Sequence, residues 1–555
     1  MILWKVKWLC VILALAQAYT VTAQQFAFQV TFTDKNNTPY SLSTPLTYLS
    51  PRAMARRAAQ GIAIDSTDLP VNPAYVDSVL TLTGGVLHGT SRWLNMCMVL
   101  VHDSAQITSL TGKPYINNIT LVGYYSTNLH GRHTQTASAQ RTTAGDCSYY
   151  GNTCVQSLLV HGNYLHNSGF NGEGKLIAVF DAGFIDVKNN PGYDSMLLNH
   201  RLVDTMDFVW RSNNVFQQDN HGSMVLSTMA GNLPGVFVGA APRAMYALYL
   251  TEYNASDQPL ELDNLLCGAE RADSIGADVI TESLGYDIFT YPPGSGQVFS
   301  QLDGKTTIGA RAANMATSKG MLFVATAGND GSPAIPGWGT HIMTPGDADS
   351  ALTIGSVDAS GTPSAFSGYG PNAAGQVKPD VSALGSAAAV LIGSGFGSDN
   401  GTSFSTPQVA GWAACLWQEN PTATTGQLRR AIIKCADHYS DPGEQLGYGI
   451  PNFQCTSQVL NVRDTPPPFT AEKWLFATPN PFTSQLILSA SPNASSDVDF
   501  QLIDMSGRLV WSAQYFLYKG YNNTLTISLS DLPGGLYILK AISATQHQVL
   551  KLEKK

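Results

Sequence analysis

The sequence contains few charged residues and no excess of basic ones. Only 13% of its 555 residues are charged, and the 31 Lys and Arg residues are outnumbered by 40 Asp and Glu residues. Proteins that bind nucleic acids need a clustered positive surface, so this balance predicts no nucleic-acid partner. Beyond the N-terminal segment, no uninterrupted apolar run reaches the ~18 residues that a membrane-spanning helix requires.

The eight cysteines include no C-x-x-C pair, which disfavours a zinc knuckle or a thiol redox motif. Cys267 and Cys415 lie in apolar, helical stretches and are expected to be buried small hydrophobic side chains. Spacing does not fix the pairing of the others. Two pairs are candidate disulfides because their members lie close together or flank a loop: Cys147 with Cys154, and Cys435 with Cys455.

The first residues have the pattern of a secretory signal peptide. Lys5 and Lys7 precede an apolar run at residues 8–16, and small residues at 21–23 offer a cleavage site before Gln24. The run is too short to form a stable membrane anchor. We therefore expect residues 1–23 to be a signal peptide and the protein to be exported; the alternative is an uncleaved membrane helix.

A glycine and a serine stand at the start of a predicted helix within residues 399–415. Gly401 lacks the Cβ that would obstruct a substrate's backbone, and Ser403 follows where the helix begins. The unpaired N–H groups and partial positive charge of a helix N-terminus would stabilise an oxyanion beside that hydroxyl. A serine is a poor nucleophile at neutral pH, so this interpretation requires a base and an orienting acid elsewhere.

The required acid and base both occur upstream of this serine. Asp181 follows the apolar run at residues 176–180, which is typical of a buried strand, and open α/β sheets bind ligands beyond such strand ends. His221 opens a second predicted helix, and Gly222 clears space beside it. The order Asp, His, Ser is one of three known for this triad, and no G-x-S-x-G motif surrounds Ser403.

Each of these residues has a simpler explanation when it is taken singly. A histidine at a helix start or an aspartate at a strand end is most often a cap or a surface residue, and a Gly-Asn-Asp-Gly stretch is most simply a turn. The ordered combination favours catalysis.

The region from about residue 145 to 460 resembles the subtilase, or subtilisin-like, family of serine endopeptidases. The segments that match the family's motifs, in the family's order, are residues 179–183, 221–223, 283–285, 327–329 and 401–407. The resemblance implies an α/β fold, with a parallel sheet and flanking helices, and hydrolysis of peptide bonds in protein or peptide substrates. Two departures from the family's pattern, Ala182 and Ser223, remove no catalytic atom.

The catalytic roles follow from the chemistry as well as from this resemblance. Ser403 attacks the scissile carbonyl, and His221 accepts its proton and later passes it to the leaving amine. Asp181 holds the imidazole in the useful tautomer. Asn329 donates its side-chain amide to the oxyanion of the tetrahedral intermediate.

Two further segments acquire a role through the resemblance alone. Ser283, Leu284 and Gly285 would form an edge strand that pairs with the extended backbone of the substrate. Ala327 and Gly328 would line the primary specificity pocket. No cofactor is required.

Structural calcium is common in the family, and several loop aspartates are candidate ligands, although such residues usually cap turns. These candidates are Asp186, Asp194, Asp347 and Asp349.

Apolar strands alternate with amphipathic helices through the region that resembles the subtilases. Helices are expected at residues 261–274 and 306–319, and strands at 279–280, 321–325 and 351–357. Such alternation indicates βαβ units and a parallel sheet. Because 555 residues are too many for one compact core, we expect two to four domains, of which residues 145–460 are the catalytic one.

Residues 24–128 are expected to form a separate α+β domain. A strand is predicted at 26–32, and residues 50–61 have the serine cap, first-turn proline and terminal glycine of a helix. The placement resembles a subtilase propeptide, which implies that it assists folding and inhibits the active site until it is cleaved; the alternative is an unrelated domain. Residues 126–145 have the composition of an exposed linker, in which Arg141 is one candidate cleavage site.

The C-terminal region begins after a stiff proline linker at residues 463–469. Short strands separated by turn residues predict a small β-sandwich at residues 474–555. The predicted strands cover residues 484–489, 498–504, 508–513, 525–529 and 535–540.

This C-terminal region also resembles the sorting domain of the bacterial type IX secretion system. The matching residues are 479–482, 504–510, 535–540 and the closing lysines. The resemblance implies that outer-membrane secretion machinery is a partner and that the protein is secreted or displayed on the cell surface; the alternative is a carbohydrate- or protein-binding module. The sequence as a whole predicts an exported endopeptidase, against a non-catalytic adhesin or a peptide ligase on the same scaffold.

Overall fold

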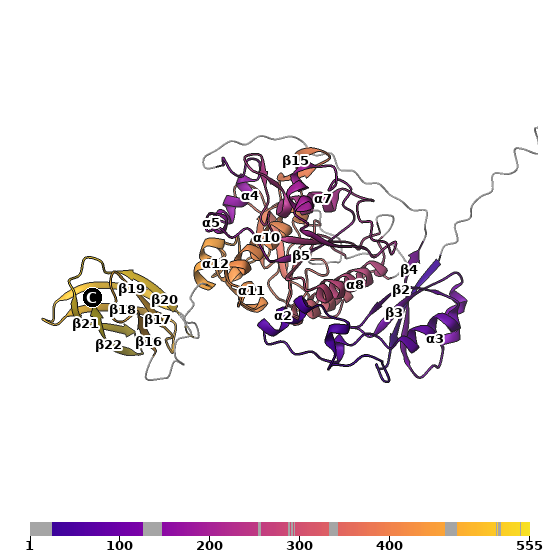
Figure 1. Ribbon diagram of the computed structural model, residues 1–555, viewed down its shortest axis with the longest axis horizontal. Coiled ribbons are helices and arrows are strands. Elements are labelled where there is room, and N and C mark those ends of the chain that lie inside the picture. Colours follow the sequence, from indigo (N-terminus) through magenta and orange to yellow (C-terminus); the bar gives the residue numbers. More distant parts are fainter. Residues whose placement is uncertain are drawn as a thin grey trace, which may run out of the picture. The chain divides into compact units, whose positions relative to one another are not determined.

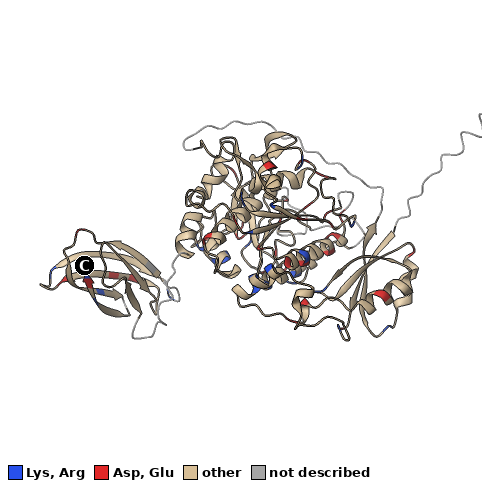
Figure 2. Ribbon diagram, viewed as in Figure 1, with Lys and Arg blue, Asp and Glu red and all other residues tan. Residues whose placement is uncertain are grey.

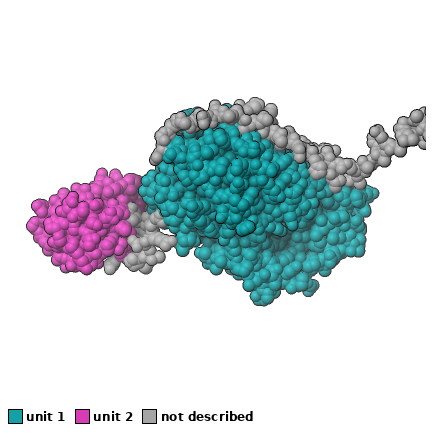
Figure 3. Space-filling model, turned by 45° about the horizontal axis from the view of Figure 1, so that its top comes forward, with its two compact units in different colours: residues 1–460 teal, residues 461–555 magenta. Residues whose placement is uncertain are grey.

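The structure is a computed structural model in which two compact units, residues 1–460 and 461–555, are distinguished (Figure 3). The predicted signal peptide, the segment with Arg141 and the proline linker lie outside the residues that it describes. Within the described part, no helix has the length and apolarity needed to cross a membrane. The described residues are 25–125, 147–253, 257–286, 289, 292, 295–331, 342–460, 474–517, 519, 523–543 and 545–555.

A parallel sheet of seven strands forms the centre of the first unit, in the order β13-β12-β11-β10-β5-β9-β6. Figure 1 shows β5 of this sheet. From β5 the chain continues to β6 and β9 on one side of the sheet and then to β10–β13 on the other. The direction in which strands are added therefore reverses between β5 and β10, and α/β folds bind ligands at such a point. The strands are β5 (Leu176–Asp181), β6 (Leu202–Asp207), β9 (Met245–Leu250), β10 (Val279–Glu282), β11 (Leu322–Thr326), β12 (Leu352–Val357) and β13 (Val381–Leu384).

Helices cover both faces of this sheet, which confirms the predicted α/β class. Successive side chains of a strand point to opposite faces. Accordingly, Ile177 and Val179 of β5 pack in the cluster that contains α7 (His221–Ala230) and α10 (Thr402–Glu419). Their neighbours Ala178 and Phe180 pack in the cluster that contains α8 (Pro259–Ile275) and α9 (Ile308–Ser318). The other α-helices among the described residues of this region are α4 (Cys154–Leu159), α5 (Asn163–Asn167), α6 (Asp194–Leu198), α11 (Thr425–Lys434) and α12 (Phe453–Leu460).

Two short antiparallel pairs complete this part of the unit. They are β7 (Asn232–Leu233) with β8 (Phe237–Val238), and β14 (Ala388–Ile392) with β15 (Gly395–Asp399).

The N-terminal part of the same unit is a four-stranded antiparallel sheet in the order β2-β3-β1-β4. One face of this sheet packs on α3 (Pro73–Thr83), and the other packs against α8 (Figure 1). The predicted helix at 50–61 is α2 (Pro51–Ala59), and its Ser50 cap accepts a hydrogen bond from the N–H of Ala53. The strands are β1 (Gln25–Phe32), β2 (Val86–Ser91), β3 (Met96–Val101) and β4 (Ile116–Tyr125).

The second unit is a sandwich of a three-stranded and a four-stranded antiparallel sheet, as the turn pattern predicted. Apolar side chains from both sheets share one core, which includes Leu486, Phe500 and Leu539. Its first and last strands, β16 and β22, were not predicted from the sequence. The strands are β16 (Leu475–Thr478), β17 (Gln485–Ala490), β18 (Ser496–Asp504), β19 (Leu509–Leu517), β20 (Asn523–Ser528), β21 (Gly535–Ser543) and β22 (His547–Lys554).

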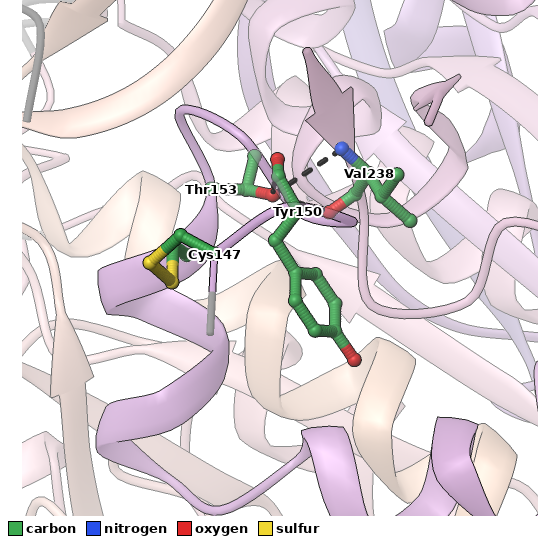
Figure 4. The surroundings of a disulfide bond; sticks show 5 residues. Cys147, Tyr150, Thr153 and Val238 are labelled. Carbon is green, nitrogen blue, oxygen red and sulfur yellow. Dashed lines mark hydrogen bonds between the residues drawn. A yellow bond between two sulfur atoms is a disulfide. The ribbon is translucent and has the colours of Figure 1, made fainter. Parts of the chain in front are cut away.

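The cysteines pair as the sequence suggested, in two disulfides, Cys147–Cys154 and Cys435–Cys455. Figure 4 shows the first of these at the start of the region that resembles the subtilases, where the hydroxyl of Thr153 donates a 2.6 Å hydrogen bond to the carbonyl oxygen of Val238 and accepts one from its N–H. These hydrogen bonds hold the start of α4 against β8, and the disulfide joins Cys147 to the first residue of that helix. Cys267 and Cys415 are buried free thiols, as expected.

Candidate active site

Asp181 and His221 form a hydrogen-bonded pair at the carboxyl end of β5. The Nδ1 atom of His221 lies 2.7 Å from Oδ1 of Asp181, whose side chain is completely buried. Gly222 makes this approach possible, because a Cβ there would lie 2.5 Å from the carbonyl oxygen of Gly183 and 2.7 Å from the Cβ of Asp181. The N-terminus of α7 is further held by Asp219, whose carboxylate accepts a 2.7 Å hydrogen bond from the backbone N–H of His221.

The surroundings of His221 favour its charged form. Burial alone would lower the pKa of this imidazole, but the charge of Asp181 and the hydrogen bond to it outweigh burial. Asp219 and Glu252 act in the same direction, and together these carboxylates raise the pKa of His221 to about 9. An imidazole whose Nδ1–H is held by a carboxylate presents its Nε2 atom to the cleft.

Ser403 is the second residue of α10 and is almost completely buried. Its hydroxyl donates a 3.1 Å hydrogen bond to the carbonyl oxygen of Ser283, and the hydroxyl of Ser283 donates one of 3.0 Å to the carbonyl oxygen of Ser403. The adjacent Phe404 ring lies 5.8 Å from the imidazole of His221, centroid to centroid. The start of α10 is therefore fixed against both the end of β10 and the histidine.

Asn329, three residues after β11, is fixed through its side-chain oxygen. That oxygen accepts hydrogen bonds of 2.9 Å from the backbone N–H and from the hydroxyl of Thr402. Since the amide oxygen faces Thr402, the NH₂ group at the other side of the amide is directed away from it. The backbone N–H of Ser403 lies in the first turn of α10, where N–H groups have no intrahelical acceptor.

One cleft of about 420 Å³ is lined by His221, Asn329 and Ser403 together. Two residues predicted from the sequence are not part of the cleft lining: Asp181 lies behind His221, and Ala327 is fully buried. Gly328, which was predicted together with Ala327, is part of the lining. The complete lining is Ala182, Asp219, His221, Glu252, Ser283, Leu284, Gly285, Thr326, Gly328, Asn329, Asp330, Met343 and Ser403.

The segment Ser283–Gly285 differs from the predicted edge strand. It continues β10, which lies between β11 and β5 in the middle of the sheet. The next residue, Tyr286, forms an antiparallel bridge with Thr344. Since β10 ends at Glu282, residues 283–285 extend past the carboxyl end of a central strand and are not an edge strand.

Several residues of the cleft were not anticipated from the sequence. Glu252 follows β9 as Asp181 ends β5, so the same argument from strand ends would have found it. Burial raises the pKa of Glu252 to about 8, and the charge of Asp181 adds to this effect while His221 opposes it. Asp219 and Asp330 adjoin recognised motif residues. Met343 follows no motif or strand end, and nothing in the sequence signals its position.

Buried ion pairs bind the N-terminal domain to the catalytic region. Figure 2 shows basic and acidic residues along the ribbon at α2 and α8, where these pairs form. Asp273 of α8 is fully buried and binds three guanidinium groups. Arg57 and Arg92 lie 2.7 and 2.6 Å from its Oδ2 atom, and Arg56 contacts Oδ1. Lys319 pairs with Asp68 at 3.2 Å.

The last strand of the N-terminal domain ends near the cleft. The ring of Tyr125 lies 5.2 Å from that of Trp210, which lies 5.4 Å from the ring of Tyr253, the residue after Glu252. The backbone N–H of Tyr124 donates a 2.5 Å hydrogen bond to the side chain of Gln258.

Comparison with known families identifies all three parts of the chain. The subtilase family matches residues 172–450, half of the chain, and the protein therefore belongs to the subtilase family and is a serine endopeptidase. The peptidase S8 propeptide domain of Bacteroidota matches residues 27–141, and the secretion system C-terminal sorting domain matches residues 477–555. The sorting domain indicates export, so the protein is secreted or attached to the cell surface.

Two subtilisins agree with this assignment. Subtilisin from Bacillus pumilus is 30% identical over 298 residues, which cover 53% of this chain and 94% of that protein. Subtilisin NAT from Bacillus subtilis subsp. natto is 31% identical over 299 residues, covering 53% of this chain and 68% of that protein. Among solved structures, MycP1 from Mycobacterium smegmatis is 24% identical with a TM-score of 0.45, covering 61% of this chain and 93% of that one.

Subtilases need no cofactor for catalysis, and the aspartates suggested as calcium ligands make other contacts. Asp186 and Asp347 accept hydrogen bonds from the N–H groups of Gly393 and Gly304, and Asp349 lies 3.3 Å from Lys305. Asp194 begins α6. Among the described residues, no group of three or more His, Cys, Asp and Glu side chains is placed to hold a metal ion. Calcium binding stays a prediction.

Proposed function

We propose that the protein hydrolyses peptide bonds through an acyl-enzyme, with Asp181, His221 and Ser403 as the catalytic triad. The observation that carries the proposal is the 2.7 Å hydrogen bond from His221 to Asp181 beside a cleft that Ser403 also lines. A nucleophile, a base and an orienting carboxylate are the three groups that this chemistry requires.

Acylation begins when the Ser403 hydroxyl gives up its bond to the Ser283 carbonyl oxygen and donates to Nε2 of His221 instead. The oxygen attacks the scissile carbonyl carbon as its proton passes to Nε2, and Asp181 stabilises the imidazolium that results. The C–N bond then breaks, and the imidazolium protonates the departing amine. The product of this half-reaction is an ester between Ser403 and the acyl part of the substrate.

The negative charge of the tetrahedral intermediate is stabilised by two donors. One is the NH₂ group of Asn329, held by the bonds between its side-chain oxygen and Thr402. The other is the N–H of Ser403 at the start of α10. Donors that are fixed before the reaction cost no reorganisation when charge develops.

Deacylation repeats these steps with water as the nucleophile. His221 takes a proton from the water, the hydroxide adds to the ester carbonyl, and the Ser403 oxygen leaves with the proton from the imidazolium. The substrate backbone is held during both halves by Ser283–Gly285, whose position beyond β10 leaves it available for pairing with an extended peptide.

The N-terminal domain acts as an inhibitor in this proposal. Its buried ion pairs with α8 and the position of Tyr125 near the segment that follows Glu252 support this role. The domain would block the cleft until residues between it and the catalytic region are cut.

The C-terminal sandwich would engage the type IX secretion machinery of the outer membrane. Deletion of residues 474–555 should leave hydrolytic activity intact but trap the enzyme in the periplasm. Recovery of the truncated protein in the medium would refute this role of the sandwich without affecting the proposed chemistry.

Hydrolysis is tested with the Ser403→Ala variant. We expect the wild-type protein to digest a denatured protein substrate and to release its N-terminal domain, and the variant to do neither. A variant that still releases this domain would assign maturation to another protease. A folded wild-type protein that has lost its N-terminal domain and still cleaves no peptide would favour the adhesin instead.

A further inference from the structure

Met343 occupies the space between the two glycine-containing segments of the cleft. A Cβ added to Gly285 would lie 2.7 Å from the Sδ atom of Met343 and 3.1 Å from its Cβ. A Cβ added to Gly328 would lie 2.7 Å from the same Sδ and 2.9 Å from Cγ. The thioether therefore packs closely against both segments at once.

The backbone at Met343 is firmly held. The next residue, Thr344, exchanges backbone hydrogen bonds of 2.9 and 3.1 Å with Tyr286. Its hydroxyl lies 2.6 Å from that of Thr307 at the start of α9. Ile342 and Thr344 are fully buried, whereas Met343 is half-buried and faces the cleft.

The position of the scissile bond determines which substrate side chain meets Met343. A carbonyl attacked by Ser403 and bound by Asn329 belongs to the residue that precedes the cleaved bond. If that residue's backbone pairs with Ser283–Gly285, its side chain enters between Gly285 and Gly328. Met343 fills this same space.

We propose that Met343 restricts this pocket and makes the enzyme selective for peptides with a small side chain, such as alanine, before the cleaved bond. This inference rests on the proposed function and adds the class of peptide that the enzyme cleaves preferentially. Rotation about the outer bonds of the methionine would move Sδ and Cε, but the Cβ beside Gly285 is fixed by the backbone. A large aromatic side chain therefore cannot be accommodated by a rotamer change alone.

The test uses the protein after removal of its N-terminal domain and two chromogenic peptide anilides that differ only in the residue before the cleaved bond, alanine or phenylalanine. We expect the wild-type enzyme to have the higher kcat/KM for the alanine peptide. Met343→Gly should shift the ratio of the two kcat/KM values towards phenylalanine by at least ~10-fold, because even one methylene group in a pocket is worth roughly 10- to 200-fold. Met343→Leu, which conserves volume, should retain the alanine preference.

Titration of Ser403 with a fluorophosphonate separates the possible failures. An unlabelled wild-type protein that cleaves neither peptide would overturn the proposed function. A labelled wild-type enzyme that cleaves both peptides equally well, or a labelled Met343→Gly enzyme with an unchanged ratio, would overturn only the role of Met343. Should the glycine variant not fold, Met343→Ala keeps the fixed Cβ but removes Cγ, Sδ and Cε, so it should shift the ratio towards phenylalanine by a smaller factor; an unchanged ratio would again overturn the role of Met343.

Discussion

The imidazole of His221 and the carboxylate of Asp181 are joined by a 2.7 Å hydrogen bond, and the pKa of His221 is raised to about 9. Only the neutral imidazole can accept the Ser403 proton. Because a raised pKa keeps the imidazole charged up to higher pH, kcat/KM should be low at neutral pH and rise through about pH 9. Initial rates at low substrate concentration between pH 6 and about 11 would measure this, since the unperturbed pKa of histidine is ~6.5. A profile that is already flat at pH 7 would contradict it.

Glu252 should contribute to that alkaline requirement. Its pKa is raised to about 8, so it is ionised when His221 loses its proton near pH 9 and favours the imidazolium. Glu252→Gln should therefore move the ascending limb of the kcat/KM profile to lower pH. Asp330→Asn is the matched control, since Asp330 lines the same cleft but is not among the largest contributors to the raised pKa of His221. Equal displacement by both variants would show a general effect of cleft charge instead.

Replacement of Asn329 by alanine should reduce kcat with little change in KM. The amide binds charge that develops only in the transition state, and loss of one such donor costs roughly 100- to 1,000-fold in kcat. Steady-state kinetics with a peptide anilide would separate the two constants. A rise in KM with an unchanged kcat would instead assign Asn329 to substrate binding.

The buried ion pairs of Asp273 should stabilise the form of the protein that retains its N-terminal domain. Removing this charge takes away the carboxylate with which buried Arg56 and Arg92 pair, while Arg57 keeps its pair with Asp68 at 2.8 Å. Breaking a buried pair costs about 3–5 kcal/mol. In a Ser403→Ala background, Asp273→Asn should lower the denaturant midpoint for separation of the N-terminal domain.

Glu173→Gln is the control for this measurement. Glu173 pairs with Arg243 at 3.0 Å, but the two side chains are 40% and 64% exposed, and exposed pairs contribute ~0–1 kcal/mol. Similar midpoints for Asp273→Asn and the parent would show that the ion pairs do not hold the N-terminal domain.

The elements that sequence alone predicted are those whose local pattern agrees with their tertiary surroundings. The apolar run of β5 is buried on both faces, so its composition was sufficient, and Ser50 caps α2 through a local hydrogen bond. β22 was missed because charged residues interrupt its apolar positions. Lys554 in that strand is buried, with its ammonium bound to the carbonyl oxygens of Leu529 and Ser530, and these partners are distant in sequence.

The candidate site divides in the same way. Asp181, His221, Asn329 and Ser403 stand in short motifs whose chemistry can be inferred before folding. The contacts that tune or restrict the site, such as those of Glu252 and Met343, arise from segments that only the folded chain brings to the cleft. The position of Ser283–Gly285 beyond a central strand was likewise not predicted, because it depends on the order of the strands in the sheet. Short sequence motifs do not encode that order.

The most direct test of the account is covalent labelling of Ser403 by a fluorophosphonate, mapped by mass spectrometry after removal of the N-terminal domain. We expect a single modified serine, Ser403, and a strong loss of labelling in His221→Ala, because the hydroxyl reacts only when the imidazole takes its proton. An unmodified Ser403 in folded protein, or labelling that persists unchanged in His221→Ala, would contradict the proposed triad.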